Sequence, residues 1–106
     1  MIRVILADDH AFVREGYKRI LASEPGFTVV AEAADIPSTL QSLENEPADV
    51  LLLDINLKGR SALEILADIR KQHPRVAVLV VSMHPEEQIA VRAMRAGAGG
   101  YLNKEA

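Results

Sequence analysis

Five short apolar runs alternate with four longer amphipathic stretches along this chain of 106 residues. The runs are almost continuously apolar, which favours strands buried on both faces of a parallel sheet. They cover residues 2–7, 27–33, 50–53 and 76–81 and, more weakly, 100–102. Apolar residues at helical spacing predict helices over residues 11–24, 35–46, 61–73 and 86–96. This order predicts an α/β fold with a doubly wound five-stranded parallel sheet of flavodoxin-like order 2-1-3-4-5.

The boundaries of these elements are marked by turn and capping residues. Pro25-Gly26, Pro47 and His73-Pro74 interrupt the pattern between predicted elements. Ser61 followed by Glu64 predicts a capping box that opens the helix over 61–73. Without a repeat or a linker, residues 1–106 are expected to form one domain.

The last predicted strand is followed by only four residues. A further helix is needed after that strand to cover the sheet face beside the helix over 11–24, so we expect the last helix to be missing from this chain. That face should then expose apolar surface, which tends to find partners. A homodimer is one expected consequence.

Composition excludes several kinds of function. Twelve Lys and Arg against fifteen Asp and Glu give a net charge of −3, which is unsuited to binding nucleic acid through overall charge. The absence of cysteine excludes disulfides and thiolate nucleophiles. The longest apolar run is too short to span a membrane, and no signal peptide opens the chain, so we expect a cytoplasmic protein without membrane contact.

Polar residues follow the predicted strands where ligands bind in such sheets, at the carboxyl ends beside the switch point. They include Asp8, Asp9, His10, Asp54, Asn56, Ser82 and Lys104. Clustered carboxylates need a cation, and oxygen ligands suit Mg²⁺. A carboxylate can also accept a phosphoryl group, while an amine and a hydroxyl stabilise its oxygens. The pattern therefore suggests phosphoryl transfer to an Asp, without indicating which one. None of the three histidines has metal-ligand spacing.

Four motifs carry a family resemblance: ILADDH at 5–10, LLLDINLKG at 51–59, VLVVSMH at 78–84 and AGAGGYLNK at 96–104. With them the chain resembles a receiver domain of two-component response regulators. The ADDH, SMH and GYL segments resemble the NarL/LuxR-type subgroup. Proteins of that subgroup usually carry a C-terminal helix-turn-helix domain, which this chain lacks.

The resemblance implies a phosphorylation-dependent switch in which a histidine kinase transfers a phosphoryl group to Asp54. Asp9, Asp54 and the backbone carbonyl of Asn56 would bind Mg²⁺ or Mn²⁺ directly, and Asp8 would act through water. Ser82 and Lys104 would complete the catalytic set. Such a domain turns over no separate substrate and is not an enzyme in that sense.

Ser82 and Tyr101 match the family's hydroxyl and aromatic switch residues. DNA would be bound only through an output domain outside this chain, and transcription would be controlled there. Lys58, Ala62 and Glu105 depart from the usual Pro, Gly and Pro of the family. The last departure makes a cis peptide bond after Lys104 less expected.

Two other functions remain open at this point. One is a receiver-like interaction module that is never phosphorylated. The other is a hydrolase with an Asp nucleophile, similar to the haloacid dehalogenases. Those enzymes need a second Asp two residues after the nucleophile, where this chain has Asn56.

Overall fold

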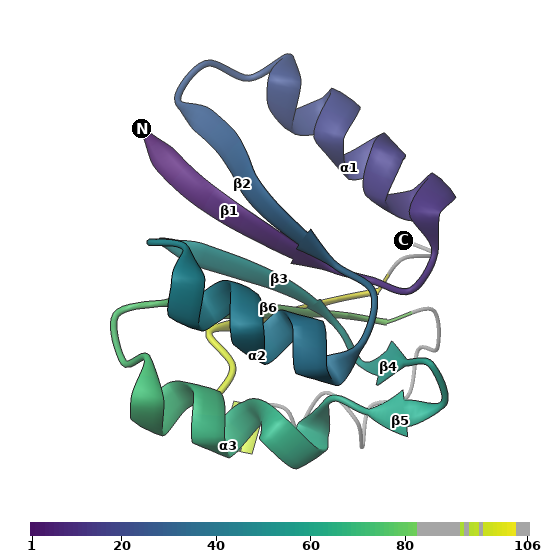
Figure 1. Cartoon of the computed structure of the whole chain (residues 1–106), viewed down its shortest axis with the longest axis vertical. Coiled ribbons are helices and arrows are strands. Elements are labelled where there is room, and N and C mark those ends of the chain that lie inside the picture. Colours follow the sequence, from purple (N-terminus) through teal and green to yellow (C-terminus); the bar gives the residue numbers. More distant parts are fainter. Residues whose placement is uncertain (83–91, 93, 96, 104–106) are drawn as a thin grey trace.

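A computed structural model describes residues 1–82, 92, 94, 95 and 97–103, the last three by their backbone. Its strands are β1 (Ile2–Ala7), β2 (Phe27–Ala33), β3 (Val50–Asp54), β4 (Asn56–Leu57), β5 (Arg60–Ser61), β6 (Ala77–Ser82) and β7 (Gly100–Asn103). Its helices are α1 (Ala11–Ala22), α2 (Ile36–Asn45) and α3 (Leu63–Gln72). Five strands form one parallel sheet in the order β2-β1-β3-β6-β7 (Figure 1). This confirms the predicted order 2-1-3-4-5 of the main strands.

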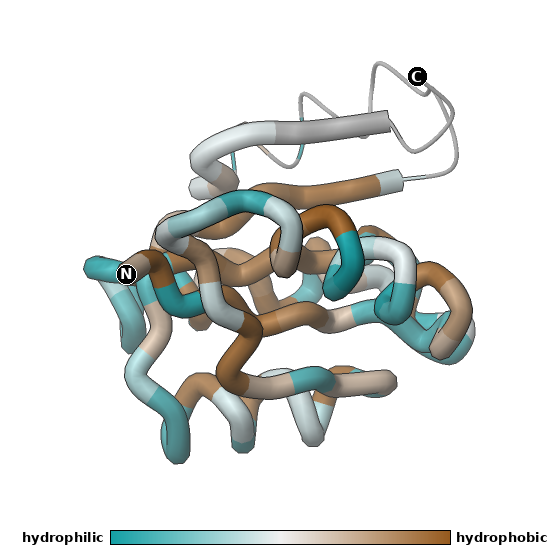
Figure 2. The backbone as a smooth tube through the Cα atoms, turned by 90° about the horizontal axis from the view of Figure 1, so that it is seen from above, coloured by the Kyte–Doolittle hydropathy of each residue, from teal (hydrophilic) through white to brown (hydrophobic). Residues whose placement is uncertain are grey.

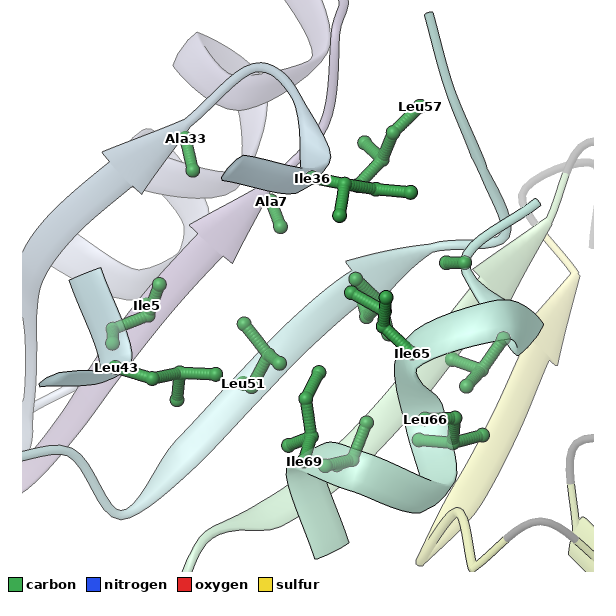
Figure 3. Close-up of a cluster of buried hydrophobic side chains, with 14 of the residues drawn as sticks. Ile5, Ala7, Ala33, Ile36, Leu43, Leu51, Leu57, Ile65, Leu66 and Ile69 are labelled. Carbon is green, nitrogen blue, oxygen red and sulfur yellow. The ribbon is translucent and has the colours of Figure 1, made fainter. Parts of the chain in front are cut away.

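The two faces of the sheet differ because successive side chains of a strand point to opposite sides. On β3, Leu51 and Leu53 belong to a buried core with residues of α2 and α3. Figure 3 shows Leu43 of α2 near Leu51, and Ile69 of α3 beside them. The central strands β3 and β6 are almost continuously apolar, and hydrophobic segments run through the middle of the backbone trace in Figure 2. The main core therefore lies between the sheet and the α2–α3 side.

The opposite face, which carries α1, is partly open. An apolar hollow of about 360 Å³ lies between α1 and the central strands. Its lining is Val4, Tyr17, Ile20, Leu21, Phe27, Val50, Leu52, Leu79 and Val81. This agrees with the expectation that the sheet face beside the first helix exposes apolar surface. Among the described residues, no helix is long and apolar enough to cross a membrane.

Helix α2 begins at a capping box that the sequence analysis did not identify. The Asp35 side chain accepts a hydrogen bond from the Ser38 backbone N–H at 2.8 Å, and the Ser38 hydroxyl lies 3.3 Å from the Asp35 backbone nitrogen. Hydrogen bonds from the Ser38 side chain and backbone lower the pKa of Asp35 below its usual value. These contacts fix the start of α2 next to the carboxyl end of β2.

The capping box predicted at Ser61 and Glu64 is wrong. Helix α3 begins at Leu63 with Ala62 as its N-cap, and Ala62 makes no side-chain capping hydrogen bond. The Ser61 hydroxyl accepts a hydrogen bond from the Leu63 N–H at 3.3 Å rather than from Glu64. Ser61 instead belongs to β5, which pairs antiparallel with β4. A two-residue turn of Lys58 and Gly59, both at positive φ, joins these strands. Because Ser61 pairs with Asn56 in this hairpin, it lies in a strand, and the helix begins two residues later, at Leu63.

The buried anchor of this hairpin is Leu57, which lies beside Ile36 of α2 in Figure 3. Most of the helix predicted over 86–96 lies outside the described residues. The peptide bond after Lys104 lies outside them as well.

An ion pair ties the start of β1 to the turn before β3 and makes stability depend on pH. Arg3 binds Asp49 through its backbone N–H at 2.8 Å and through two guanidinium nitrogens at 3.1 and 3.2 Å. The hydrogen bonds from the Arg3 side chain and backbone lower the pKa of Asp49 from 3.8 to about 2. The unfolded chain therefore binds this proton at a higher pH than the folded chain does.

The stabilisation from this pair is expected to be complete above about pH 5 and to be lost as the pH falls toward about 2. The free energy of unfolding in urea, measured at several pH values for the native chain and for the variant Asp49→Asn, should show this loss. The native chain should lose more stability than the variant over this interval, and added salt should shrink the difference because the pair is partly exposed. Parallel stability profiles for the two proteins would contradict this expectation.

Candidate functional site

Acidic side chains meet at the carboxyl edge of the central strands, as the sequence analysis predicted. Ligand atoms of Asp8, Asp9, His10 and Asp54 all lie within 4.8 Å of one another. Asp8 and Asp54 are buried, whereas the Asp9 side chain retains 21% exposure. These carboxylates come from two strand ends more than forty residues apart in the chain.

Strand register brings them together. In the β1–β3 pair Ala7 is opposite Leu53, so the residues that follow, Asp8 and Asp54, leave the sheet side by side. The backbone N–H of Asp8 donates to the carbonyl of Ala33 at 3.0 Å, which holds the strand end against β2. Parallel pairing therefore places these two carboxylates on one edge of the sheet.

The β4–β5 hairpin supplies backbone donors to the same carboxylates. The Asn56 N–H donates to Asp54 Oδ1 at 3.2 Å. The Lys58 N–H donates to Asp9 Oδ2 at 3.0 Å. The hairpin thus closes over the acidic cluster and orients two of its carboxylates through main-chain contacts, which any residue other than proline can make.

Helix α1 holds the other side of the cluster with a positively charged residue. The Arg14 guanidinium donates to the backbone carbonyl of Asp8 and to Glu32 Oε1. Lys18, one turn further along α1, bridges Glu15 and Glu32. These contacts fasten the turn between β1 and α1, so that Asp8 and Asp9 are held on a rigid support.

The donor atoms of the cluster fit a divalent cation. Three carboxylates gathered in a small volume repel one another unless a positive charge lies between them. Asp9 Oδ1 is buried and accepts no hydrogen bond within the described part of the chain. Carboxylate oxygens of this kind are the ligands that Mg²⁺ takes in proteins. The residues therefore fit the ion that the sequence resemblance implied.

Of the remaining predicted site residues, the structure describes Ser82 in full, Tyr101 by its backbone, and Lys104 not at all. Ser82 ends β6 and is fully buried. In the strand pair β6–β7 it is opposite Asn103, the residue before Lys104. Lys104 lies outside the described residues. Tyr101 is placed by its backbone, opposite Val80, and its side chain is not described.

Two contributors to the cluster, His10 and Lys58, were expected near this edge from the sequence but were not assigned as site residues. His10 has no second histidine at ligand spacing, yet its Nδ1 lies 2.9 Å from Asp9 Oδ1 and 3.1 Å from Asp8 Oδ1. Lys58 acts through its backbone N–H, which carries no sequence signal. For His10, the available signal was its position directly after two acidic residues at a strand end.

A doubly wound parallel sheet with three carboxylates at its switch point defines a class of α/β proteins whose ligands bind at that edge. The family model of the response regulator receiver domain matches residues 4–106. The chain belongs to this family.

Similar proteins come from the same group of regulators. The transcriptional regulatory protein DegU of Brevibacillus brevis is 41% identical over 104 residues, which are 98% of this chain and 44% of that protein. The nitrate/nitrite response regulator NarL of Escherichia coli is 34% identical over 102 residues, 96% of this chain and 47% of that protein. The chain thus spans about half the length of these curated relatives.

Solved structures agree with this fold. A LuxR-family two-component response regulator from Aurantimonas superimposes with a TM-score of 0.91 at 36% identity, covering 98% of this chain and 74% of that one. The signal receiver domain of the putative regulator NarL from Mycobacterium tuberculosis has a TM-score of 0.91 at 34% identity, covering 99% and 85%. The protein is therefore a receiver domain of the LuxR-type response regulators.

Proposed function

We propose that this receiver domain is a switch that accepts a phosphoryl group on Asp54 from a histidine kinase and passes the signal to a transcription-regulating output domain. The single observation that carries the proposal is the meeting of Asp54 with Asp8 and Asp9 in one cluster at the switch point. Of the curated relatives, DegU is described as a transcriptional regulatory protein and NarL as a nitrate/nitrite response regulator protein.

Asp54 is assigned the role of acceptor because of where it lies. It ends β3, the central strand of the sheet, and the Asn56 N–H fixes one of its oxygens. An attacking carboxylate must be held in line with the incoming phosphorus atom, and this contact restricts its rotation. One Asp54 oxygen forms the new bond to phosphorus, and the bond between phosphorus and the donor breaks.

The charge that develops on the phosphoryl oxygens must be offset. A bound Mg²⁺ supplies this positive charge when it is present. Asp9, Asp54 and the Asn56 carbonyl are proposed as its direct ligands, and Asp8 as a ligand through water. Lys104, which follows the strand paired with β6, is proposed to neutralise a phosphoryl oxygen.

The output signal is proposed to start at Ser82. This hydroxyl is buried at the end of β6, next to the strand that carries Asp54. A phosphoryl group adds about one unit of negative charge and three acceptor oxygens, which attract a nearby hydroxyl. Movement of Ser82 would leave space for Tyr101 of β7 to turn inward. The surface around β7 would then change shape and favour a homodimer or a partner domain.

The proposal is tested by NMR with beryllofluoride, which mimics a phosphoryl group on a carboxylate. With Mg²⁺ present, the amide signals of Ser82 and Tyr101 should shift, and the variant Asp54→Asn should abolish these shifts. Unchanged signals at both positions in the native chain would instead favour a constitutive interaction module. We expect cytoplasmic localisation for such a switch.

A further inference from the structure

The acidic cluster contains a nitrogen atom that the proposed Mg²⁺ site does not use. His10 is the N-cap residue of α1, and its side chain makes no capping hydrogen bond. Its backbone N–H donates to Asp8 Oδ1 at 2.9 Å, which turns the imidazole back toward the two acidic residues before it. Although the His10 side chain is 63% exposed, its Nδ1 atom lies inside the cluster.

The distances around this nitrogen match those between neighbouring ligands of one ion. Two ligand atoms about 2.1 Å from an ion lie about 3.0 Å apart in octahedral coordination and about 3.4 Å apart in tetrahedral coordination. Nδ1 lies 2.9 Å from Asp9 Oδ1 and 3.1 Å from Asp8 Oδ1. The four candidate ligand atoms all lie within 4.8 Å of one another, so they are close enough to contact one ion.

Hydrogen bonding accounts for only one of the two contacts. Nδ1 is in hydrogen-bonding geometry with Asp8 Oδ1. Asp9 Oδ1, although 2.9 Å from the same nitrogen, is buried and accepts no hydrogen bond from any described residue. The contact between Nδ1 and Asp9 Oδ1 is favourable only when a positive charge lies at it, either a proton on the imidazole or a cation bound to both atoms.

We propose that His10 binds the divalent cation of this site through Nδ1, so that the site takes nitrogen-preferring ions such as Zn²⁺ more tightly than Mg²⁺. This rests on the proposed function only in placing a cation at the acidic cluster. Imidazole nitrogen is a good ligand for Zn²⁺ and a poor one for Mg²⁺, which prefers oxygen.

Two variants separate ligation from positioning. His10→Ala removes the imidazole, and His10→Asn keeps a hydrogen-bonding amide close to the place of Nδ1 without the imidazole nitrogen. His73→Ala is the matched control, because His73 lies at the C-terminus of α3 and pairs with Glu44. His10 is largely exposed, so its variants should fold.

Calorimetry with the metal-free chain should show that both His10 variants weaken Zn²⁺ binding about tenfold or more, while Mg²⁺ binding changes less than about threefold. The control variant should match the native chain. Pulsed electron paramagnetic resonance of Mn²⁺ bound to the native chain should show coupling to an imidazole nitrogen, and this coupling should vanish in His10→Ala. Equal losses for Zn²⁺ and Mg²⁺, native Zn²⁺ affinity in His10→Asn, or no nitrogen coupling would each overturn the proposal.

These measurements use no phosphoryl donor, so they test the role of His10 separately from the proposed function. Mn²⁺ binding without nitrogen coupling would remove the role of His10 and leave phosphorylation of Asp54 intact. Nitrogen coupling in a chain that cannot be phosphorylated would remove the switch and leave the metal site.

Discussion

Replacing Asp54 with Ala is expected to abolish labelling of the chain by acetyl phosphate in the presence of Mg²⁺. The rate should fall to less than about one-hundredth of the native rate, because the nucleophile that forms the covalent bond is gone. Asp54 is the acidic residue of the cluster that ends the central strand β3, and its carboxylate is held by the Asn56 N–H. Incorporation of phosphate is measured by intact mass, and its position by fragmentation of borohydride-treated protein.

Two variants make this result specific. Asp54→Asn keeps the shape of the side chain and should also be unlabelled, which would exclude a collapse of the site as the cause. Asp68→Ala removes an exposed carboxylate of α3 and should label as the native chain does. Native labelling of Asp54→Ala would refute the assignment of the acceptor, and labelling that moves to Asp8 or Asp9 would show that the cluster can use another carboxylate.

Truncating either of two adjacent leucines of β3 is expected to lower the free energy of unfolding by very different amounts. Leu53→Ala should lower the free energy of unfolding by about 3 kcal/mol, within a range of about 2–5 kcal/mol, because it leaves a cavity in a closely packed core. Leu53 is completely buried on the α2–α3 side of the sheet. Its neighbour Leu52 points to the other side and lines the apolar hollow beside α1.

Leu52→Ala should therefore cost less, about 1–2 kcal/mol, because its side chain already borders open space and has fewer contacts to lose. Urea unfolding at neutral pH, followed by far-ultraviolet circular dichroism, gives both values. Equal losses for the two variants would mean that the hollow is filled in solution. A smaller loss for Leu53→Ala than for Leu52→Ala would contradict the division of the sheet into a packed and an open face.

The sequence predicted the main sheet well because its strands carry strong local signals. The runs at residues 2–7 and 27–33 match β1 and β2, and the run at 50–53 is one residue shorter than β3. Buried parallel strands are apolar on both faces, so each can be recognised without knowing its neighbours. The same holds for the apolar spacing that marked α1 and α2.

Errors appeared where local and tertiary signals compete. Ser61 and Glu64 have the spacing of a capping box, but pairing of Ser61 with Asn56 places the serine in a strand. The box that does form, Asp35 with Ser38, has serine in place of the usual Glu or Gln at its third position. The hairpin turn was also missed, because Lys58 carries no preference for the positive φ that it adopts.

The amino-acid sequence by itself determined the order of strands and helices and, through four motifs, the family and the acidic residues of the site. These features are local, since periodicity and short motifs depend only on residues that are close in the sequence. Only the tertiary structure decided that Asp54 and His10 share one cluster and that Asp9 is held by the Lys58 backbone. Such contacts join segments more than forty residues apart, and they depend on strand register and on backbone atoms, which have no sequence signature.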